Sequence, residues 1–371
     1  MGETVWAWLQ VGGGLVVLVL GGELLVRGAA QLAAAMRISS VVIGLTIVAF
    51  GTSAPELAVS LQAALAGNPD LAVGNVVGSN IFNVLFILGL SAMITPLAVA
   101  SDLIRRDVPI MIGVSILLLL MGLDGKLGRV DGLILAAGII SYTWWCIQVS
   151  RKQGSAAELT LVQQTSPTAV VPSPSRIAWV LNAAYIVAGV LLLIAGSQYL
   201  QWGAVSIAQS FGVSELVIGL TIVAAGTSLP EVSTSVVAAL KGERDIAVGN
   251  VVGSNIFNIL SVLGFSAALA PQGIQISPTA LAFDIPVMIV VAIACWPIFV
   301  TGNAISRWEG GVFLTYYLAY TTHLVLEASG HELKHTLSAA MLLFVIPLTV
   351  LALAISWWSS YRSTSPTPQR N

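Results

Sequence analysis

The sequence predicts an all-α polytopic membrane protein, built from inverted five-helix repeats (5+5) plus one extra C-terminal helix, with about 11 transmembrane helices. Three observations lead to this fold class: few charged residues, apolar blocks of membrane-spanning length, and an internal repeat with an odd number of spans. Charged residues make up 9% of the 371-residue chain and apolar residues 57%, whereas soluble domains carry about 25% charged residues. This composition disfavours a soluble enzyme, a nucleic-acid-binding protein and a disordered chain.

Apolar blocks of about 20 residues each fit helices that cross the hydrocarbon core of a bilayer. They cover residues 5–26, 39–66, 71–95, 106–123, 130–150, 178–201, 214–240, 246–270, 281–301, 308–327 and 337–358. Residues 151–177 are rich in Ser, Thr, Gln and Pro and are predicted to be a cytoplasmic linker between the repeats 1–150 and 178–328. The segment 337–358 is the extra transmembrane helix, and residues 359–371 are predicted to be a disordered tail.

The basic residues orient these spans. Threading the chain through the membrane places Lys126, Arg129 and Lys334 on one side and the other 12 of the 15 basic residues on the opposite side. The positive-inside rule then predicts an external N-terminus and a cytoplasmic C-terminus. The first residues, MGETVWAW, lack the basic segment of a signal peptide, so the first apolar block is predicted to be a retained helix. With no targeting segment, the expected location is a prokaryotic inner membrane.

The chain contains an internal repeat. Residues 39–92 and 214–267 align without a gap at an offset of 175, and 37 of the 54 positions are identical. Each half holds five spans, so the second half must enter the membrane from the opposite side. Inverted-topology repeats of this kind are typical of secondary transporters.

Each repeat carries the motif G-T-S-x-P-E near the middle of a span, at Gly51 to Glu56 and at Gly226 to Glu231. Gly and Pro interrupt a helix there, at a depth where irregular backbone is tolerated only inside protein or beside a wet cavity. Freed carbonyls near Ala49 and Ala224 are expected to point into that cavity. A bound cation would offset the cost of burying two carboxylates and would remove their mutual repulsion.

The oxygen atoms of this region suit a hard cation. Two carboxylates, four hydroxyls and several carbonyls fit Ca²⁺, which takes about 6–8 oxygen ligands, and they fit Na⁺ as well. The next span of each repeat reads G-N-V-V-G-S-N-I-F-N, and its Ser and last Asn, four residues apart, share one helix face. The neutral ligands predicted from this span are Ser79, Asn83, Ser254 and Asn258. Asn80 and Asn255 point elsewhere and are predicted to pack between helices.

Three acidic residues outside the motifs receive other roles. Asp107 and Asp284 stand two residues before a proline at the start of a span, and both are predicted to be N-caps, with gating as the alternative. Glu23 lies near the cytoplasmic end of the first span and is expected to be solvated.

The two repeats resemble the alpha-repeats of the calcium/cation antiporter superfamily, in particular the sodium/calcium exchangers and their prokaryotic relatives. The resemblance rests on G-T-S-x-P-E followed by G-N-x-x-G-S-N, a pair that occurs twice. It implies ion ligation by side chains and by two backbone carbonyls. The side chains are Thr52, Ser53, Glu56, Ser79, Asn83, Thr227, Ser228, Glu231, Ser254 and Asn258, and the carbonyls are those of Ala49 and Ala224.

The resemblance also implies that the first and sixth spans slide across the core to alternate access. Some relatives, including potassium-dependent exchangers, have Asp where this chain has Asn258. The two acidic groups that remain argue against potassium co-transport.

The expected function is secondary active exchange of Ca²⁺ for Na⁺ by alternating access at a midplane all-oxygen site, with no permanently bound cofactor. A Ca²⁺/H⁺ or other cation/H⁺ antiporter is the alternative. A cation channel is less favoured, because mirrored repeats indicate alternation between two gates. An enzyme is the weakest option, since no His, Cys or Lys lies near the motifs. The expected partners are Ca²⁺, monovalent cations and the lipid bilayer, with no nucleic acid.

Overall fold

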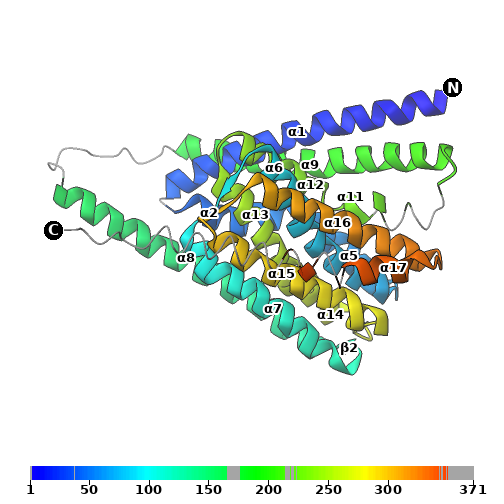
Figure 1. Cartoon of the computed structure of the whole chain (residues 1–371). Helices are drawn as coiled ribbons and strands as arrows, with labels where there is room; N and C mark the ends of the chain where they lie inside the picture. Colours follow the sequence, from blue (N-terminus) through cyan, green and yellow to red (C-terminus); the bar gives the residue numbers. More distant parts are fainter. Residues whose placement is uncertain are drawn as a thin grey trace, which may run out of the picture.

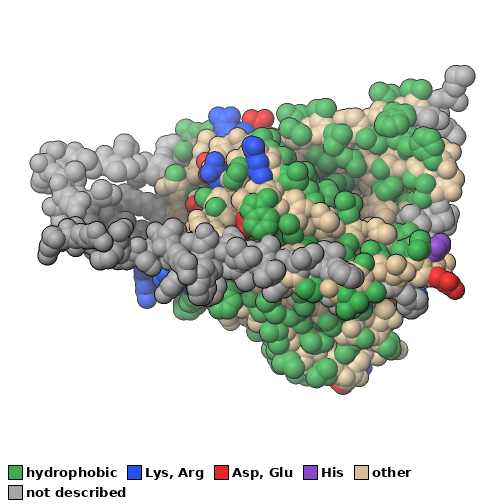
Figure 2. All heavy atoms as spheres, viewed as in Figure 1, with side chains coloured by type: hydrophobic (Ala, Val, Ile, Leu, Met, Phe, Trp, Pro, Cys, Tyr) green, Lys and Arg blue, Asp and Glu red, His purple; other side chains and the backbone are tan. Residues whose placement is uncertain are grey.

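The computed structural model describes residues 2–36, 38–164, 176–213 and 224–341, together with the single positions 218, 221, 222, 343, 346, 347 and 349. The described residues form a bundle of long helices (Figure 1). Hydrophobic side chains spread over the face seen in Figure 2, and most of the charged side chains gather toward its ends. This is the surface of an integral membrane protein, and it confirms the predicted fold class.

The first half of the chain alternates α-helices with short π-helical segments and two short strands. Its elements are α1 (Gly2–Met36), α2 (Ser40–Ile43), π-helix η1 (Gly44–Val48), α3 (Ala49–Thr52), α4 (Ala54–Leu65), α5 (Pro69–Phe82), π-helix η2 (Asn83–Leu88), α6 (Gly89–Ile94), β1 (Leu97–Ala98), π-helix η3 (Leu103–Asp107), α7 (Val108–Met121), 3-10 helix η4 (Gly122–Asp124), β2 (Lys126–Leu127) and α8 (Arg129–Gln164).

The second half repeats this order within its described residues. Its elements are α9 (Arg176–Ser210), α11 (Ala224–Gly226), α12 (Leu229–Leu240), α13 (Arg244–Phe257), π-helix η6 (Asn258–Leu263), α14 (Gly264–Leu269), β3 (Ile274–Gln275), π-helix η7 (Ala280–Asp284), α15 (Ile285–Val300), β4 (Ala304–Ile305), α16 (Arg307–Ala328) and α17 (Leu333–Ala340).

Seven described helices are long and apolar enough to cross a membrane, and a bent pair, Ser40–Thr52 with Ala54–Leu65, makes eight. These eight coincide with eight of the predicted spans. The predicted span 308–327 corresponds to α16, which is long enough but more polar, with side chains such as Tyr316 and His323. The predicted spans 214–240 and 337–358 lie partly outside the described residues, and the predicted tail 359–371 lies wholly outside them.

The predicted linker 151–177 begins as a helix. α8 continues through its first part to Gln164, and residues 165–175 lie outside the described part of the chain. The stretch after Gly154 reads SAAELTLVQQ, which is rich in strong helix formers. These residues favour continuation of helix α8. The flexible linker was predicted from the Ser, Gln and Pro content of the whole segment 151–177, which did not separate its helix-forming first part.

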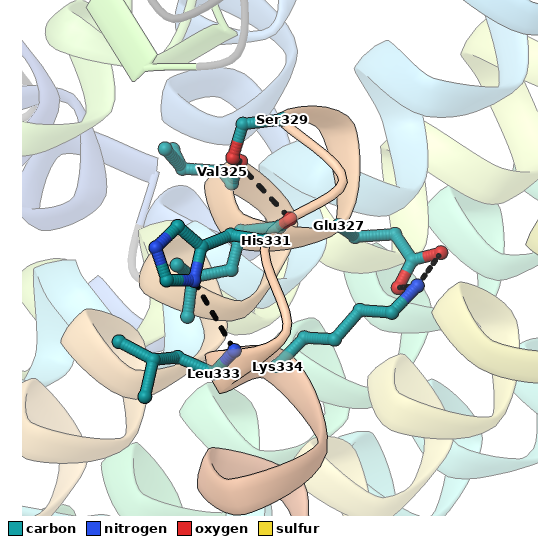
Figure 3. A network of polar contacts seen from close by, with 7 residues as sticks. Val325, Glu327, Ser329, His331, Leu333 and Lys334 are labelled. Atoms are coloured by element: carbon teal, nitrogen blue, oxygen red, sulfur yellow. Dashed lines mark hydrogen bonds and ion pairs between the residues drawn. The ribbon is translucent and has the colours of Figure 1, made fainter.

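The turn after α16 is held by local polar contacts (Figure 3). The ring nitrogen Nδ1 of His331 accepts a hydrogen bond from the backbone N–H of Leu333 at 3.2 Å, which satisfies a free donor at the start of α17. Lys334 forms an ion pair with Glu327 at 3.0 Å. His331 thus serves as a helix cap at this turn.

Two strand pairs show that the repeats are inverted. β1 pairs antiparallel with β4, and β2 pairs antiparallel with β3. β1 and β3 each follow the third span of their repeat, and the spanning helix 103–124 separates β1 from β2. Because β3 lies beside β2, it lies on the opposite side of the membrane from β1. Equivalent segments therefore face opposite ways.

α1 and α9 lie side by side along their length (Figure 1). A Cβ atom added at Gly14 would lie 2.6 Å from the backbone nitrogen of Leu200, and one at Gly21 would lie 2.8 Å from that of Leu193. The contacts run in opposite directions along the two helices, so the pair is antiparallel. The glycines at this seam recur at seven-residue intervals: Gly14, Gly21 and Gly28 in α1, and Gly189, Gly196 and Gly203 in α9.

We expect Gly14→Ala to lower the melting temperature of the detergent-purified protein by a few degrees. The new methyl group would overlap the α9 backbone, and overpacking of this kind costs about 1–3 kcal/mol. Gly13→Ala is the matched control, because a Cβ atom there meets no described atom within 4 Å and alanine favours the helix. Equal shifts of the melting temperature in both variants would contradict the tight α1–α9 seam.

Candidate functional site

Both G-T-S-x-P-E motifs begin a new helix inside the molecule. The helices before and after Ser53 differ in direction by 47°. Pro55 and Pro230 stand in the first turns of α4 and α12, where a residue without an N–H is tolerated. Glu56 and Glu231 therefore lie in first turns as well, where the helix dipole stabilises negative charge. Both glutamates are 0% exposed.

The two carboxyl groups are bound by serines of the opposite repeat. Ser228 Oγ donates to Glu56 Oε1 at 3.0 Å, and Ser53 Oγ donates to Glu231 Oε1 at 3.2 Å. Ser79 Oγ also donates to Glu56 Oε1, at 3.1 Å, and it contacts Ser228 Oγ. The structure thus brings the two predicted acidic residues together from oppositely inserted halves of the chain.

The two motif threonines also bond across the repeats. Thr52 Oγ1 donates to Asn250 Oδ1 at 3.1 Å, and Thr227 Oγ1 donates to Asn75 Oδ1 at 3.2 Å. Thr52 is fully buried and Thr227 is half-buried. Each threonine hydroxyl is therefore held by an amide of the other repeat.

Sequence reasoning missed Asn75 and Asn250, although a signal was present. Asn75, Ser79 and Asn83 follow one another at intervals of four residues and so share one face of the helix that runs from α5 into the first residue of η2. The equivalent Asn250 precedes Ser254 in α13 by the same interval. Extending the face by one turn would have included both asparagines.

Four carboxyl and amide oxygens at this site lack a hydrogen-bond partner within the described residues, Glu56 Oε2, Glu231 Oε2, Asn83 Oδ1 and Asn258 Oδ1, and so does the hydroxyl oxygen of Ser254. All five side chains are 0% exposed. The π-helix η6, which begins at Asn258, packs against α4, and η2, which begins at Asn83, packs against α12. Unpaired buried acceptors are costly, and a cation is a group that could satisfy oxygens of this kind.

The amide nitrogens of the same two asparagines are anchored. Asn83 Nδ2 donates to Asn255 Oδ1, and Asn258 Nδ2 donates to Asn80 Oδ1, both at 3.0 Å. Asn80 and Asn255 therefore lie between the helices, as the sequence predicted, and they also bond predicted ligands. Ser254, the counterpart of Ser79, is buried in α13.

The backbone carbonyls differ from expectation. The Ala49 carbonyl is not freed, because the helix breaks only at Ser53 and the Ser53 N–H still reaches it at 3.0 Å. The carbonyl that Pro230 deprives of its helical donor belongs to Gly226, and Ser197 of α9 binds it at 2.6 Å. Ala224 is described by its backbone at the start of α11.

The predicted N-caps at Asp107 and Asp284 are wrong. Neither side chain makes a capping hydrogen bond, because η3 and η7 continue directly into α7 and α15 and leave no free helix start there. Asp107 instead accepts a hydrogen bond from Tyr142 at 2.9 Å, and Asp284 accepts one from Tyr320 at 3.1 Å. At the surface, Glu23 is half exposed and pairs with Lys241 at 2.7 Å.

Comparison with known proteins places this geometry in context. The chain is 41% identical over 310 residues to the protein CaxA of Alkalimonas amylolytica, which covers 83% of this chain and 95% of that protein. It is 38% identical over 289 residues to the inner membrane protein YrbG of Escherichia coli K12, covering 76% of this chain and 86% of that protein.

A solved structure of the sodium-calcium exchanger NCX_Mj superposes with a TM-score of 0.72 at 27% identity, covering 85% of this chain and 97% of that one. The family model described as sodium/calcium exchanger protein matches residues 6–148 and 181–326, which are most of the chain and both repeats. The chain therefore belongs to the sodium/calcium exchanger protein family.

Proposed function

We propose that this chain is a secondary active antiporter that exchanges Ca²⁺ for Na⁺ by alternating access at the site around Glu56 and Glu231. One observation carries the proposal: four buried oxygens without a donor in the described part of the chain, on Glu56, Glu231, Asn83 and Asn258. All four atoms are acceptors. Membership of the sodium/calcium exchanger family supports Ca²⁺ and Na⁺ as the ions.

In this proposal a single cation satisfies these oxygens together. Ca²⁺ takes about 6–8 oxygen ligands, and Na⁺ also binds carboxylate, hydroxyl and carbonyl oxygens. In this proposal Ca²⁺ balances the two carboxylates, and Na⁺ competes for the same atoms. The proposed ligands are Thr52, Ser53, Glu56, Ser79, Asn83, Thr227, Ser228, Glu231, Ser254 and Asn258, with the carbonyls of Ala49 and Ala224. The Ala49 oxygen accepts the Ser53 N–H with one lone pair and would offer the other to the ion.

Coupling follows from charge balance. An ionised group inside a membrane is costly, so the empty site with two negative charges crosses slowly, while the loaded site crosses readily. Inverted repeats supply two mirrored gates around one central site. The α1–α9 pair slides past the helix breaks and opens the site first to one side and then to the other.

The proposed location is a prokaryotic inner membrane, with the N-terminus outside and the C-terminus in the cytoplasm. The 3-to-12 distribution of basic residues supports this orientation. The name of the relative YrbG, an inner membrane protein, supports the compartment. The ions and the lipid bilayer are the partners in transport, and no permanently bound cofactor takes part.

Glu56→Gln and Glu231→Gln should each reduce calcium transport by more than about 100-fold, because each removes a buried charge that pairs with the ion. Glutamine keeps the size of the side chain, so both variants should purify as folded proteins. The measurement is ⁴⁵Ca²⁺ uptake into proteoliposomes loaded with Na⁺. Ser91→Ala is the control, since this buried hydroxyl in α6 has no hydrogen-bond partner among the described residues. Wild-type uptake by either glutamine variant would defeat the assignment.

An outward Na⁺ gradient alone should drive calcium uptake, whereas a pH gradient alone or added K⁺ should not. Two carboxylates, in place of three acidic groups, leave no further charge for a potassium ion to balance. The measurement is the same uptake assay with each gradient applied separately at clamped membrane potential. Uptake driven by the pH gradient and indifferent to Na⁺ would replace this function with Ca²⁺/H⁺ antiport.

A further inference from the structure

Two asparagines outside the proposed ligand set, Asn80 and Asn255, meet where α5 packs on α13. They are 2% and 3% exposed. Asn80 Nδ2 donates to the backbone oxygen of Asn255 at 3.2 Å, and Asn255 Nδ2 donates to the backbone oxygen of Asn80 at 3.3 Å. This reciprocal exchange joins equivalent positions of the two repeats.

The backbone carbonyls determine which end of each amide is the donor, because a carbonyl oxygen can only accept. The Nδ2 group of each of these asparagines must face its carbonyl, so each Oδ1 must face the other way. On that side Asn255 Oδ1 accepts from Asn83 Nδ2, and Asn80 Oδ1 accepts from Asn258 Nδ2, both at 3.0 Å.

The orientation of the two ligand amides follows from these contacts. With the nitrogens of Asn83 and Asn258 held by oxygens, their own oxygens face away, and these are the buried acceptors that lack a partner in the described structure. Turning either amide over would bring two oxygens within about hydrogen-bond distance with no hydrogen between them. It would also present N–H groups to the cation. Both contacts are repulsive.

The same argument applies to the two threonines. Asn75 Nδ2 donates to the backbone oxygen of Glu56 at 3.3 Å, so Asn75 Oδ1 is the end that accepts the Thr227 hydroxyl. A threonine hydroxyl has one proton and two lone pairs. With its proton committed to Asn75, the hydroxyl keeps lone pairs for a cation.

In the other repeat Asn250 Nδ2 donates to Ser235 Oγ at 3.0 Å, and Ser235 Oγ donates its own hydrogen to the Ala247 carbonyl at 3.4 Å. Asn250 Oδ1 is therefore the end that accepts the hydrogen bond from the Thr52 hydroxyl.

We propose that Asn75, Asn80, Asn250 and Asn255 are positioning residues that fix the hydrogen-bond polarity of the cation site. They act through the ligands, so that amides and hydroxyls meet the ion with acceptor atoms. The inference rests on the proposed function and adds a specific pairing across the repeats: Asn255 acts through Asn83, and Asn80 acts through Asn258.

A double-mutant cycle on the full-length purified chain tests this pairing, with Ca²⁺ affinity measured by isothermal titration in detergent. Asn255→Ala should weaken Ca²⁺ binding about tenfold, since the Asn83 amide is no longer held. In an Asn83→Ala background the same change should cost less than about twofold. In an Asn258→Ala background it should again cost about tenfold, because Asn80 holds Asn258.

Equal losses of affinity from Asn255→Ala in all three backgrounds would overturn the inference, because a general packing defect does not depend on Asn83. Asn255→Ser, which keeps a small donor and acceptor, replaces the alanine variant in the cycle if that protein does not fold. Ser266→Ala is the control, since this buried hydroxyl of α14 has no partner among the residues described, and it should bind Ca²⁺ like the wild type.

The same titrations include the wild type and Glu56→Gln. Equal Ca²⁺ affinity of these two proteins would defeat the proposed function. Loss of binding in Glu56→Gln, combined with losses from Asn255→Ala that do not depend on Asn83, would defeat only the assignment of the positioning asparagines.

Discussion

The burial of two carboxyl groups inside the membrane domain is the constraint on which the rest of the structure depends. Removing Glu56 and Glu231 from water is costly unless their charges are compensated. Each lies in the first turn of a helix and accepts a hydrogen bond from a serine hydroxyl of the opposite repeat. These features require a helix break, and lipid does not tolerate an exposed break. The surrounding helices must therefore enclose it, and the most apolar 18 residues of the span Arg244–Leu269, which includes α13, are accordingly all buried.

Inverted duplication explains how one motif provides both sides of each interaction. Ser53 and Glu56 belong to one copy, and their partners Glu231 and Ser228 belong to the other, so a single sequence supplies donor and acceptor twice. The symmetry is not complete. Ser197 binds a carbonyl at the second break, whereas the position 175 residues earlier is a glycine in α1. The two repeats therefore form equivalent scaffolds that differ locally in chemistry.

The features that could be predicted from the sequence are those set by local residue chemistry and by the internal repeat. Pro and Gly predicted the helix breaks, and the odd number of spans per repeat predicted the inversion. Contacts between distant segments were harder to infer. Asp107 lies two residues before a proline, which resembles a cap in sequence, yet its partner is Tyr142, on another helix. The π-helices were not predicted, because hydrophobic patterns in a sequence identify α-helices by a period of 3.6 residues and strands by a period of two, and neither period marks a short π-helix. The role of Asn75 depends on Thr227, which only the fold brings near.

The outer helix pair relates these contacts to the proposed transport cycle. In the most apolar 18-residue stretches of α1 and α9, only 33% and 17% of the residues are buried, so both helices lie mainly toward lipid. Glycines pack the two helices tightly against each other. α9 also lies against the helix breaks of both G-T-S-x-P-E motifs. A Cβ atom added at Gly51 would lie 2.8 Å from the Val190 side chain, and one added at Gly226 would lie 2.7 Å from the Gln201 side chain. A pair that is close-packed internally and borders on lipid can move as one body. Displacement along the breaks would then uncover the site without disturbing the crossed hydrogen bonds that build it.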